Sequence, residues 1–192
     1  MNRQIHYYNC SDTVNVTRLS KTLSSYLNYL TPVYAEPVVL CIGTDRVTGD
    51  SLGPLVGHKL ARGRLSGLPI YGTLQQPVHA LNIREQFHHI KKRHPHAPII
   101  AVDASFGKRS HVGCATISQT ALSPGIGVEK QLGSIGDISI TGIVCANSPY
   151  AQLALQTTRL DLVMKLADFI CDGIELAMLA QPSDAVYAQS GG

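Results

Sequence analysis

The sequence predicts an α/β fold, a three-layer α/β/α sandwich whose central sheet is mostly parallel. Two observations support this prediction. Residues 37–42 and 97–102 are short, wholly apolar runs, as expected for parallel strands that are covered on both faces. Such runs alternate along the chain with segments of helical periodicity, and this alternation is typical of a parallel sheet with helices on both sides.

The first half of the chain predicts two helices and two strands around one loop. The opening helix has a capping residue in Ser11 or Asp12, and Thr31-Pro32 ends it, because the residue before a proline disfavours the helical conformation. The loop is rich in Gly, Thr and Asp, and Pro54 after it suits the first turn of a helix. These elements are a helix over 11–30, a strand over 37–42, a loop over 43–53, a helix over 54–65 and a strand over 69–72.

The second half continues the alternation and ends in a long amphipathic helix, with an apolar stripe that includes Val163, Ile170 and Ile174. We expect residues 1–180 to form a single α/β domain and residues 181–192 to be a flexible tail. The predicted elements are a helix over 80–93, a strand over 97–102, a strand over 111–118, a loop over 122–136, a strand over 137–145 and a helix over 158–179.

Composition and charge narrow the function classes. The chain has 192 residues, 44% of them hydrophobic and 15% charged, which fits one globular domain. A net charge of +3, the absence of Trp and a single short basic run at Lys91-Lys92-Arg93 argue against a nucleic-acid partner. The five cysteines are widely spaced and contain no C-x-x-C pair, so they predict neither disulfides nor a structural zinc site. No apolar stretch suits a membrane span or a secretory signal, so we expect a cytoplasmic protein without a membrane partner.

The strongest candidate site joins Asp50 and Asp103. In an open parallel sheet, ligands bind beyond the carboxyl ends of the strands, where the strand order reverses. If the first three central strands take the common 2-1-3 order, that point lies between the first and the third, and both aspartates reach it. Two carboxyl groups in a partly desolvated cleft do not both ionise easily, so an acid lies beside a base and the pair can activate water for hydrolysis. The same pair can instead ligate a divalent metal.

Each aspartate also has a purely structural interpretation. Asp50 lies just before a predicted helix and can serve as its N-cap, which is the commoner role for such a residue. Asp103 follows an apolar strand, where an aspartate commonly closes a turn. Asp45 is followed by Arg46 and can simply pair with exposed cations. The sequence leaves these roles open.

The histidines point only weakly to a functional site. His88 and His89 share a predicted helix with several basic residues, which favours a solvated basic face over a metal site. His58 and His79 lie near predicted loop or helix starts and can approach the cleft.

Four motifs follow one another along most of the chain, roughly from residue 37 to 175. They are Ile42-Gly43-Thr44-Asp45-Arg46-Val47-Thr48-Gly49-Asp50-Ser51-Leu52-Gly53-Pro54, Val102-Asp103-Ala104, Ser123-Pro124-Gly125-Ile126-Gly127-Val128 and Gly136-Asp137-Ile138-Ser139-Ile140-Thr141-Gly142-Ile143-Val144. Together they resemble the YyaC-type sporulation proteins, which are spore-protease-like proteins of endospore-forming bacteria. That group is similar to the germination protease and, more distantly, to hydrogenase maturation proteases.

The resemblance implies a fold of the germination protease type and catalysis by an aspartate pair. Asp50 matches the aspartate of a Thr-Pro-Asp-Ala-Leu-Gly-Pro loop, and Asp103 matches the aspartate of an Asp-Ala pair. Hydrogenase maturation proteases hold a metal with two carboxylates and a histidine on a later loop. Residues 122–136 contain no histidine, which argues against a nickel-sensing role. We expect no cofactor. The other residues of the implied site loops are Asp45, Thr48, Gly49, Gly53, Pro124, Gly125 and Gly127.

Three functions remain open from the sequence. The first is an aspartate-dependent endopeptidase that acts on a protein or peptide, such as a spore protein, during sporulation or germination. The second is a non-catalytic binding or assembly module with the same fold. The third is a metal-dependent hydrolase of the maturation type. The resemblance implies a place in the cytoplasm of the mother cell or the forespore.

Overall fold

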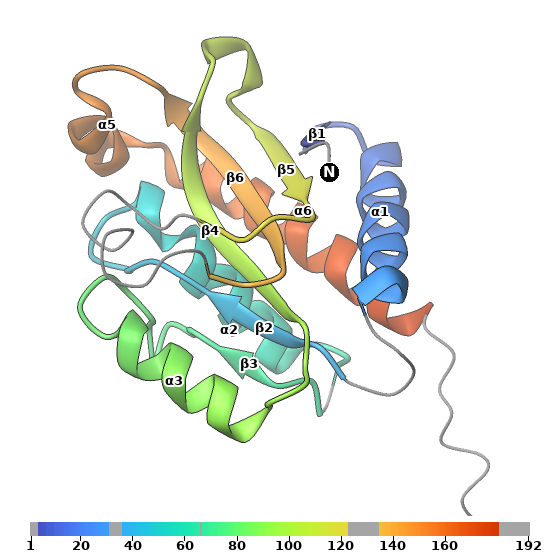
Figure 1. Cartoon of the computed structure of the whole chain (residues 1–192). Coiled ribbons are helices and arrows are strands. Elements are labelled where there is room, and N and C mark those ends of the chain that lie inside the picture. Colours follow the sequence, from blue (N-terminus) through green and yellow to red (C-terminus); the bar gives the residue numbers. More distant parts are fainter. Residues whose placement is uncertain (1–3, 31–35, 66, 123–134, 181–192) are drawn as a thin grey trace, which may run out of the picture.

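The computed structural model describes residues 4–30, 36–65, 67–122 and 135–180. These residues form one six-stranded sheet with helices on both faces (Figure 1). The strands are β1 His6–Asn9, β2 Val38–Cys41, β3 Ile70–Tyr71, β4 Ile99–Gly107, β5 Cys114–Ser118 and β6 Ile138–Ala146. The helices are α1 Val14–Leu30, α2 Leu52–Arg62, α3 Ile83–Arg93, α5 Ala151–Thr157 and α6 Leu160–Leu179, with 3-10 turns η1 Gly49–Ser51 and η2 Arg109–His111.

The sheet has the order β1-β5-β6-β4-β2-β3 and is mostly parallel. The four strands β3, β2, β4 and β6 run parallel to one another, whereas β5 is antiparallel to both of its neighbours. Helix α2 connects β2 to β3 and helix α3 connects β3 to β4, as parallel neighbours require a crossover. Since β2 lies between β3 and β4, the predicted 2-1-3 order and the predicted α/β class are both confirmed.

Two hydrophobic cores lie on opposite faces of the sheet. On one face, alternate residues of β2, β4, β5 and β6 pack against α1, α2 and α6. On the other face, Val38 and Leu40 of β2 pack with Ile83 and Ile90 of α3. Figure 1 shows α3 on one side of the sheet and α2 with α6 on the other. Strands β2 and β4 are therefore covered on both faces, which explains why both are wholly apolar at their start.

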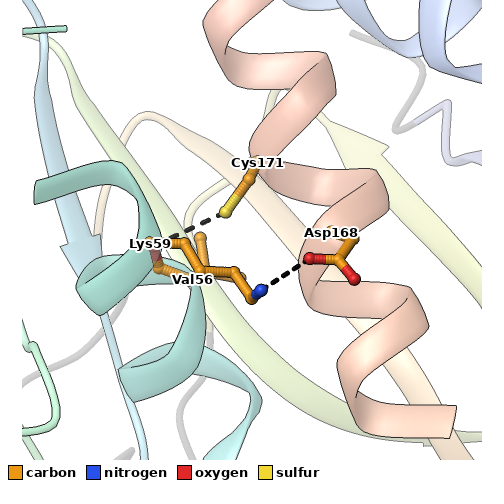
Figure 2. Close-up of polar contacts among 4 residues, drawn as sticks. All are labelled: Val56, Lys59, Asp168 and Cys171. Carbon is orange, nitrogen blue, oxygen red and sulfur yellow. Dashed lines mark hydrogen bonds and ion pairs between the residues drawn. The ribbon is translucent and has the colours of Figure 1, made fainter. Parts of the chain in front are cut away.

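The packing of α2 on α6 includes two polar contacts besides the apolar core. The Lys59 ammonium lies 2.7 Å from the Asp168 carboxylate. The Cys171 thiol donates to the backbone carbonyl of Val56, with 3.6 Å between sulfur and oxygen (Figure 2). Cys171 is buried, in agreement with a structural role, and the five cysteines are all free.

Two elements were not predicted from the sequence. Strand β1 pairs antiparallel with β5, although its polar residues gave no strand signal. Helix α5 has only seven residues and buries only Ala151 and Leu155, so its periodicity is too short to recognise. Both elements exist because the sheet provides a partner for them, which local sequence does not reveal.

Several predicted boundaries were wrong. Strand β4 continues to Gly107 and so includes Asp103, because β6 keeps pairing with it beyond Val102. The strand predicted from His111 begins only at Cys114, since residues 109–111 form a 3-10 turn. Helix α3 starts at Ile83 rather than at residue 80. Residues 123–134 of the predicted loop and the predicted tail lie outside the described residues. No helix of the described part of the chain is long and apolar enough to cross a membrane.

Candidate active site

Asp50 is positioned by a tight loop between β2 and α2. Gly43 ends the strand with φ of +139°, and a side chain there would overlap the Asp50 carbonyl oxygen. The Thr44 N–H donates to this carbonyl oxygen and to the Asp50 carboxylate Oδ2, at 3.1 Å in each case. The loop therefore folds back on itself and holds the carboxylate at the carboxyl end of β2.

Asp103 lies inside β4, opposite Thr141 of β6. Its Oδ1 accepts a hydrogen bond from the N–H of the next residue, Ala104, at 2.8 Å. The interpretation of Asp103 as a residue that closes a turn is therefore wrong, since the strand continues past it.

The N-cap interpretation of Asp50 is also wrong. Thr48 is the cap residue of the 3-10 turn and Ser51 is the cap residue of α2, and neither cap is made by an Asp50 side chain. The Asp50 side chain instead accepts the hydrogen bond from Thr44 described above.

Both carboxyl groups line one cavity of about 460 Å³ at the carboxyl ends of β2 and β4. The crevice expected from the strand order is thus present, and Asp50 and Asp103 face it together. Other lining residues include Val47, His79 and Phe106. None of the described residues that line it is Lys, Arg or Glu.

The surroundings of the two carboxyl groups affect their pKa values differently. Burial, with the charge of Asp50 as second cause, raises the pKa of Asp103 to about 8, although the Ala104 N–H opposes this shift. Burial also raises the pKa of Asp50, while the Thr44 N–H and the nearby His79 lower it. At neutral pH Asp103 therefore keeps its proton, and Asp50 is the group that ionises.

His79 is the third titratable residue at the cavity. Its backbone N–H donates to Asn82 Oδ1 at 2.8 Å, and its ring Nδ1 accepts from the Leu81 N–H at 3.3 Å. In the neutral ring the hydrogen therefore sits on Nε2, which can act as a donor. His79 thus approaches the cleft, as the sequence allowed. His58 does not line the cavity, and its ring Nε2 lies 3.5 Å from a guanidinium nitrogen of Arg62.

Of the other residues of the predicted site loops, those that the structure describes do not line this cavity. Asp45 is exposed in a turn, and the Thr48 carbonyl accepts the Ser51 hydroxyl at 2.7 Å. Gly49 and Gly53 are buried and pack against neighbouring backbone or side chains. Pro124, Gly125 and Gly127 lie outside the described residues.

The described part of the chain contains no group of three or more His, Cys, Asp or Glu residues that could hold a metal ion. On the basic helix α3, His88 is exposed, and His94 after it bonds to the Tyr71 hydroxyl at 3.0 Å.

Sequence reasoning missed the residues that α5 and the end of β4 bring to the cavity. These residues are Phe106, Gln152, Leu153, Leu155 and Gln156. A short helical pattern in residues 151–157 was the only available signal, and it does not show where the helix docks.

Comparisons with known proteins agree with the motifs. The chain is 43% identical over 171 residues to the protein described as uncharacterized protein YyaC from Bacillus subtilis strain 168, covering 88% of this chain and 82% of that protein. Among solved structures, the NiFe hydrogenase maturation protease HycI from Thermococcus kodakarensis KOD1 is similar over 82% of this chain and 99% of its own, with 15% identity and a TM-score of 0.49. A family model described as protein of unknown function DUF1256 matches residues 7–173. The YyaC resemblance is thereby confirmed, and the chain belongs to the DUF1256 family.

Proposed function

We propose that this protein is a peptidase in which Asp50 and Asp103 hydrolyse a peptide bond. The observation that supports it most is the pairing of two carboxyl groups of unequal proton affinity in one cavity. Such a pair supplies a base and an acid at the same pH. Among the described lining residues there is no Lys or Arg that would pair with either carboxyl group in place of a substrate.

In the proposed reaction, Asp50 begins as a base and Asp103 begins as an acid. Asp50, as carboxylate, takes a proton from a water molecule, whose oxygen attacks the peptide carbonyl carbon. Asp103, as neutral acid, gives its proton to the carbonyl oxygen as the tetrahedral intermediate forms. When the C–N bond breaks, the leaving amine takes up the proton that Asp50 received, and one hydroxyl group of the intermediate returns a proton to Asp103 as it becomes the carbonyl of the new carboxyl group. His79 also lines the cavity, and its neutral ring has Nε2–H as a further donor.

The proposed substrate is a protein or peptide, and the proposed setting is sporulation or germination. This setting rests on the motifs shared with YyaC-type proteins rather than on the cavity. Spore proteins are one class of substrate that fits this setting.

The test is hydrolysis of a mixed peptide library, followed by mass spectrometry, with three single variants. Asp50→Asn and Asp103→Asn each remove one proton-transfer group, so we expect at least a 100-fold loss of rate. Asp45→Asn is the matched control, because it changes an exposed carboxylate of the same loop and should leave the rate unchanged. Circular dichroism checks that all variants are folded.

The pH profile adds an independent readout. The rate should rise as Asp50 ionises and fall above about pH 8, where Asp103 loses its proton. Full activity in both aspartate variants, or no cleavage by the folded wild type, would favour the non-catalytic module. Activity that appears only after addition of a divalent metal would favour the metal-dependent hydrolase.

A further inference from the structure

Helix α5 forms one wall of the cavity and is anchored to the loop that carries Asp50. Leu155 of α5 packs directly on Gly49, since a Cβ atom at Gly49 would lie 2.7 Å from the Leu155 Cδ2. The same helix leaves Leu153 59% exposed while it lines the cavity. An apolar side chain that lines the same cavity as the aspartate pair is thus exposed to water.

The end of β4 and the Asp50 loop contribute further apolar lining residues. Val47 and Phe106 line the cavity there, and Phe106 is 36% exposed. Phe106 follows a register shift in the pairing of β4 with β6, so the strand changes its course just before this residue. Exposed apolar side chains gathered at a cavity are a mark of binding sites.

The charges at the cavity select against acidic side chains. Its titratable lining residues in the described chain are Asp50, Asp103 and His79. An acidic side chain would be repelled by the Asp50 carboxylate. A basic side chain would be attracted to that carboxylate, but it would lose part of its water shell next to the leucine and phenylalanine side chains. An apolar side chain loses no such water shell, and it removes Leu153 and Phe106 from water.

The cavity also offers partners for a peptide main chain. Gln152 and Gln156 of α5 line it and are exposed, and each side-chain amide both donates and accepts hydrogen bonds. An extended peptide presents alternating N–H and C=O groups that suit such amides.

We propose that this cavity is the subsite for a bulky apolar side chain, such as leucine or phenylalanine, next to the peptide bond that is cleaved. The inference rests on the proposed function, because it names the peptide that the aspartate pair would receive. A volume of about 460 Å³ accommodates one large side chain together with the adjoining main chain.

The test measures peptide binding apart from cleavage. Blocked hexapeptides with Leu-Phe, Glu-Glu or Lys-Lys at their centre are added to the full chain carrying Asp103→Asn, and methyl NMR follows the leucine and valine signals. We expect the Leu-Phe peptide to shift the signals of Val47, Leu153 and Leu155, and to bind at least tenfold more tightly than the other two.

A pair of variants locates the binding. Leu153→Asp places a charge at the cavity and should weaken Leu-Phe binding at least tenfold. Leu179→Asp is the matched control, because Leu179 is 58% exposed at the end of α6 and does not line the cavity. It should leave the affinity within twofold.

The outcomes separate this inference from the proposed function. Tighter binding of the Glu-Glu or Lys-Lys peptide, or no shift of the cavity methyl groups by Leu-Phe, overturns the apolar subsite. Cleavage by the wild type without an apolar preference also overturns it but keeps the peptidase. Binding of Leu-Phe at these methyl groups, without cleavage of any peptide by the wild type, keeps the subsite and overturns the peptidase.

Discussion

Helix α2 connects two regions that hold carboxyl groups in opposite ways. At its N-terminal end, Asp50 and Asp103 share a cavity whose described lining contains no Lys or Arg, and burial raises the pKa of both. Further along the same helix, Lys59 lies 2.7 Å from Asp168 on α6 (Figure 2), and this contact raises the pKa of Lys59. The second region is an ordinary partly exposed ion pair.

The difference between the two regions shows which carboxyl groups serve a function and which serve stability. An ion pair on the outside of two packed helices stabilises the protein weakly and does not need to be buried. Two carboxyl groups in one partly buried cavity destabilise the folded state whenever both are charged. Such an arrangement marks a functional site better than a structural one. The following changes probe this contrast, in order of decreasing expected effect.

Substitution of two glycines, Gly43 after β2 and Gly63 after α2, should give the largest difference in stability. Gly43→Ala would place a Cβ atom on the Asp50 carbonyl oxygen, at a φ of +139° that side chains rarely adopt. We expect it to lower the free energy of unfolding by about 2 kcal/mol or more. In Gly63→Ala the new atom meets the flexible end of Glu175 at a negative φ, so a loss below about 1 kcal/mol is expected. Urea denaturation measures both, and equal losses would contradict the packing described for the Asp50 loop.

The stability of the aspartate region should depend on pH with a definite sign. The pKa of Asp103 is raised to about 8 in the folded state. The usual value is about 3.9, so the unfolded chain binds fewer protons between these two values, and stability falls as the pH rises from about 4 to about 8. Asp103→Asn should therefore stabilise the protein at pH 8 by about 1 to 3 kcal/mol, less than the full pKa difference because the side chain is only partly buried.

The control for this prediction lies in the other region. Asp168→Asn removes the partner of Lys59 and should slightly destabilise the protein at pH 8, the opposite sign. Thermal denaturation at pH 4.5 and pH 8 measures both variants. A destabilised Asp103→Asn at pH 8 would show that the carboxylate is stabilised by the fold rather than opposed by it.

Removal of the Lys59–Asp168 ion pair should change the stability least. Lys59→Met keeps the apolar stem and removes the charge, so we expect a loss below about 1 kcal/mol and unchanged hydrolysis. The loss should shrink further in about 1 M salt, where charges are screened within about 3 Å. A loss above about 2 kcal/mol would mean that this contact contributes to the core, and a loss of activity would mean that α6 communicates with the cavity.

Much of the architecture was predictable because the signals are local. The apolar starts of β2 and β4 and the amphipathic pattern of α6 are each contained in one short window. The prediction failed at β1, at α5 and at the end of β4, where a strand or helix depends on a distant partner. Histidine positions showed the same limit, since the sequence ranked His58 and His79 alike and only His79 lines the cavity.

By itself, the sequence determined the α/β class, the family and the two aspartates of the candidate site. It did so because apolar runs, periodicity and motifs are properties of neighbouring residues. Only the tertiary structure decided that Asp50 and Asp103 share a cavity, that burial keeps a proton on Asp103, and that α5 adds an apolar wall. These features depend on contacts between segments far apart in the chain and on the exclusion of water between those segments. Neither can be predicted from neighbouring residues alone.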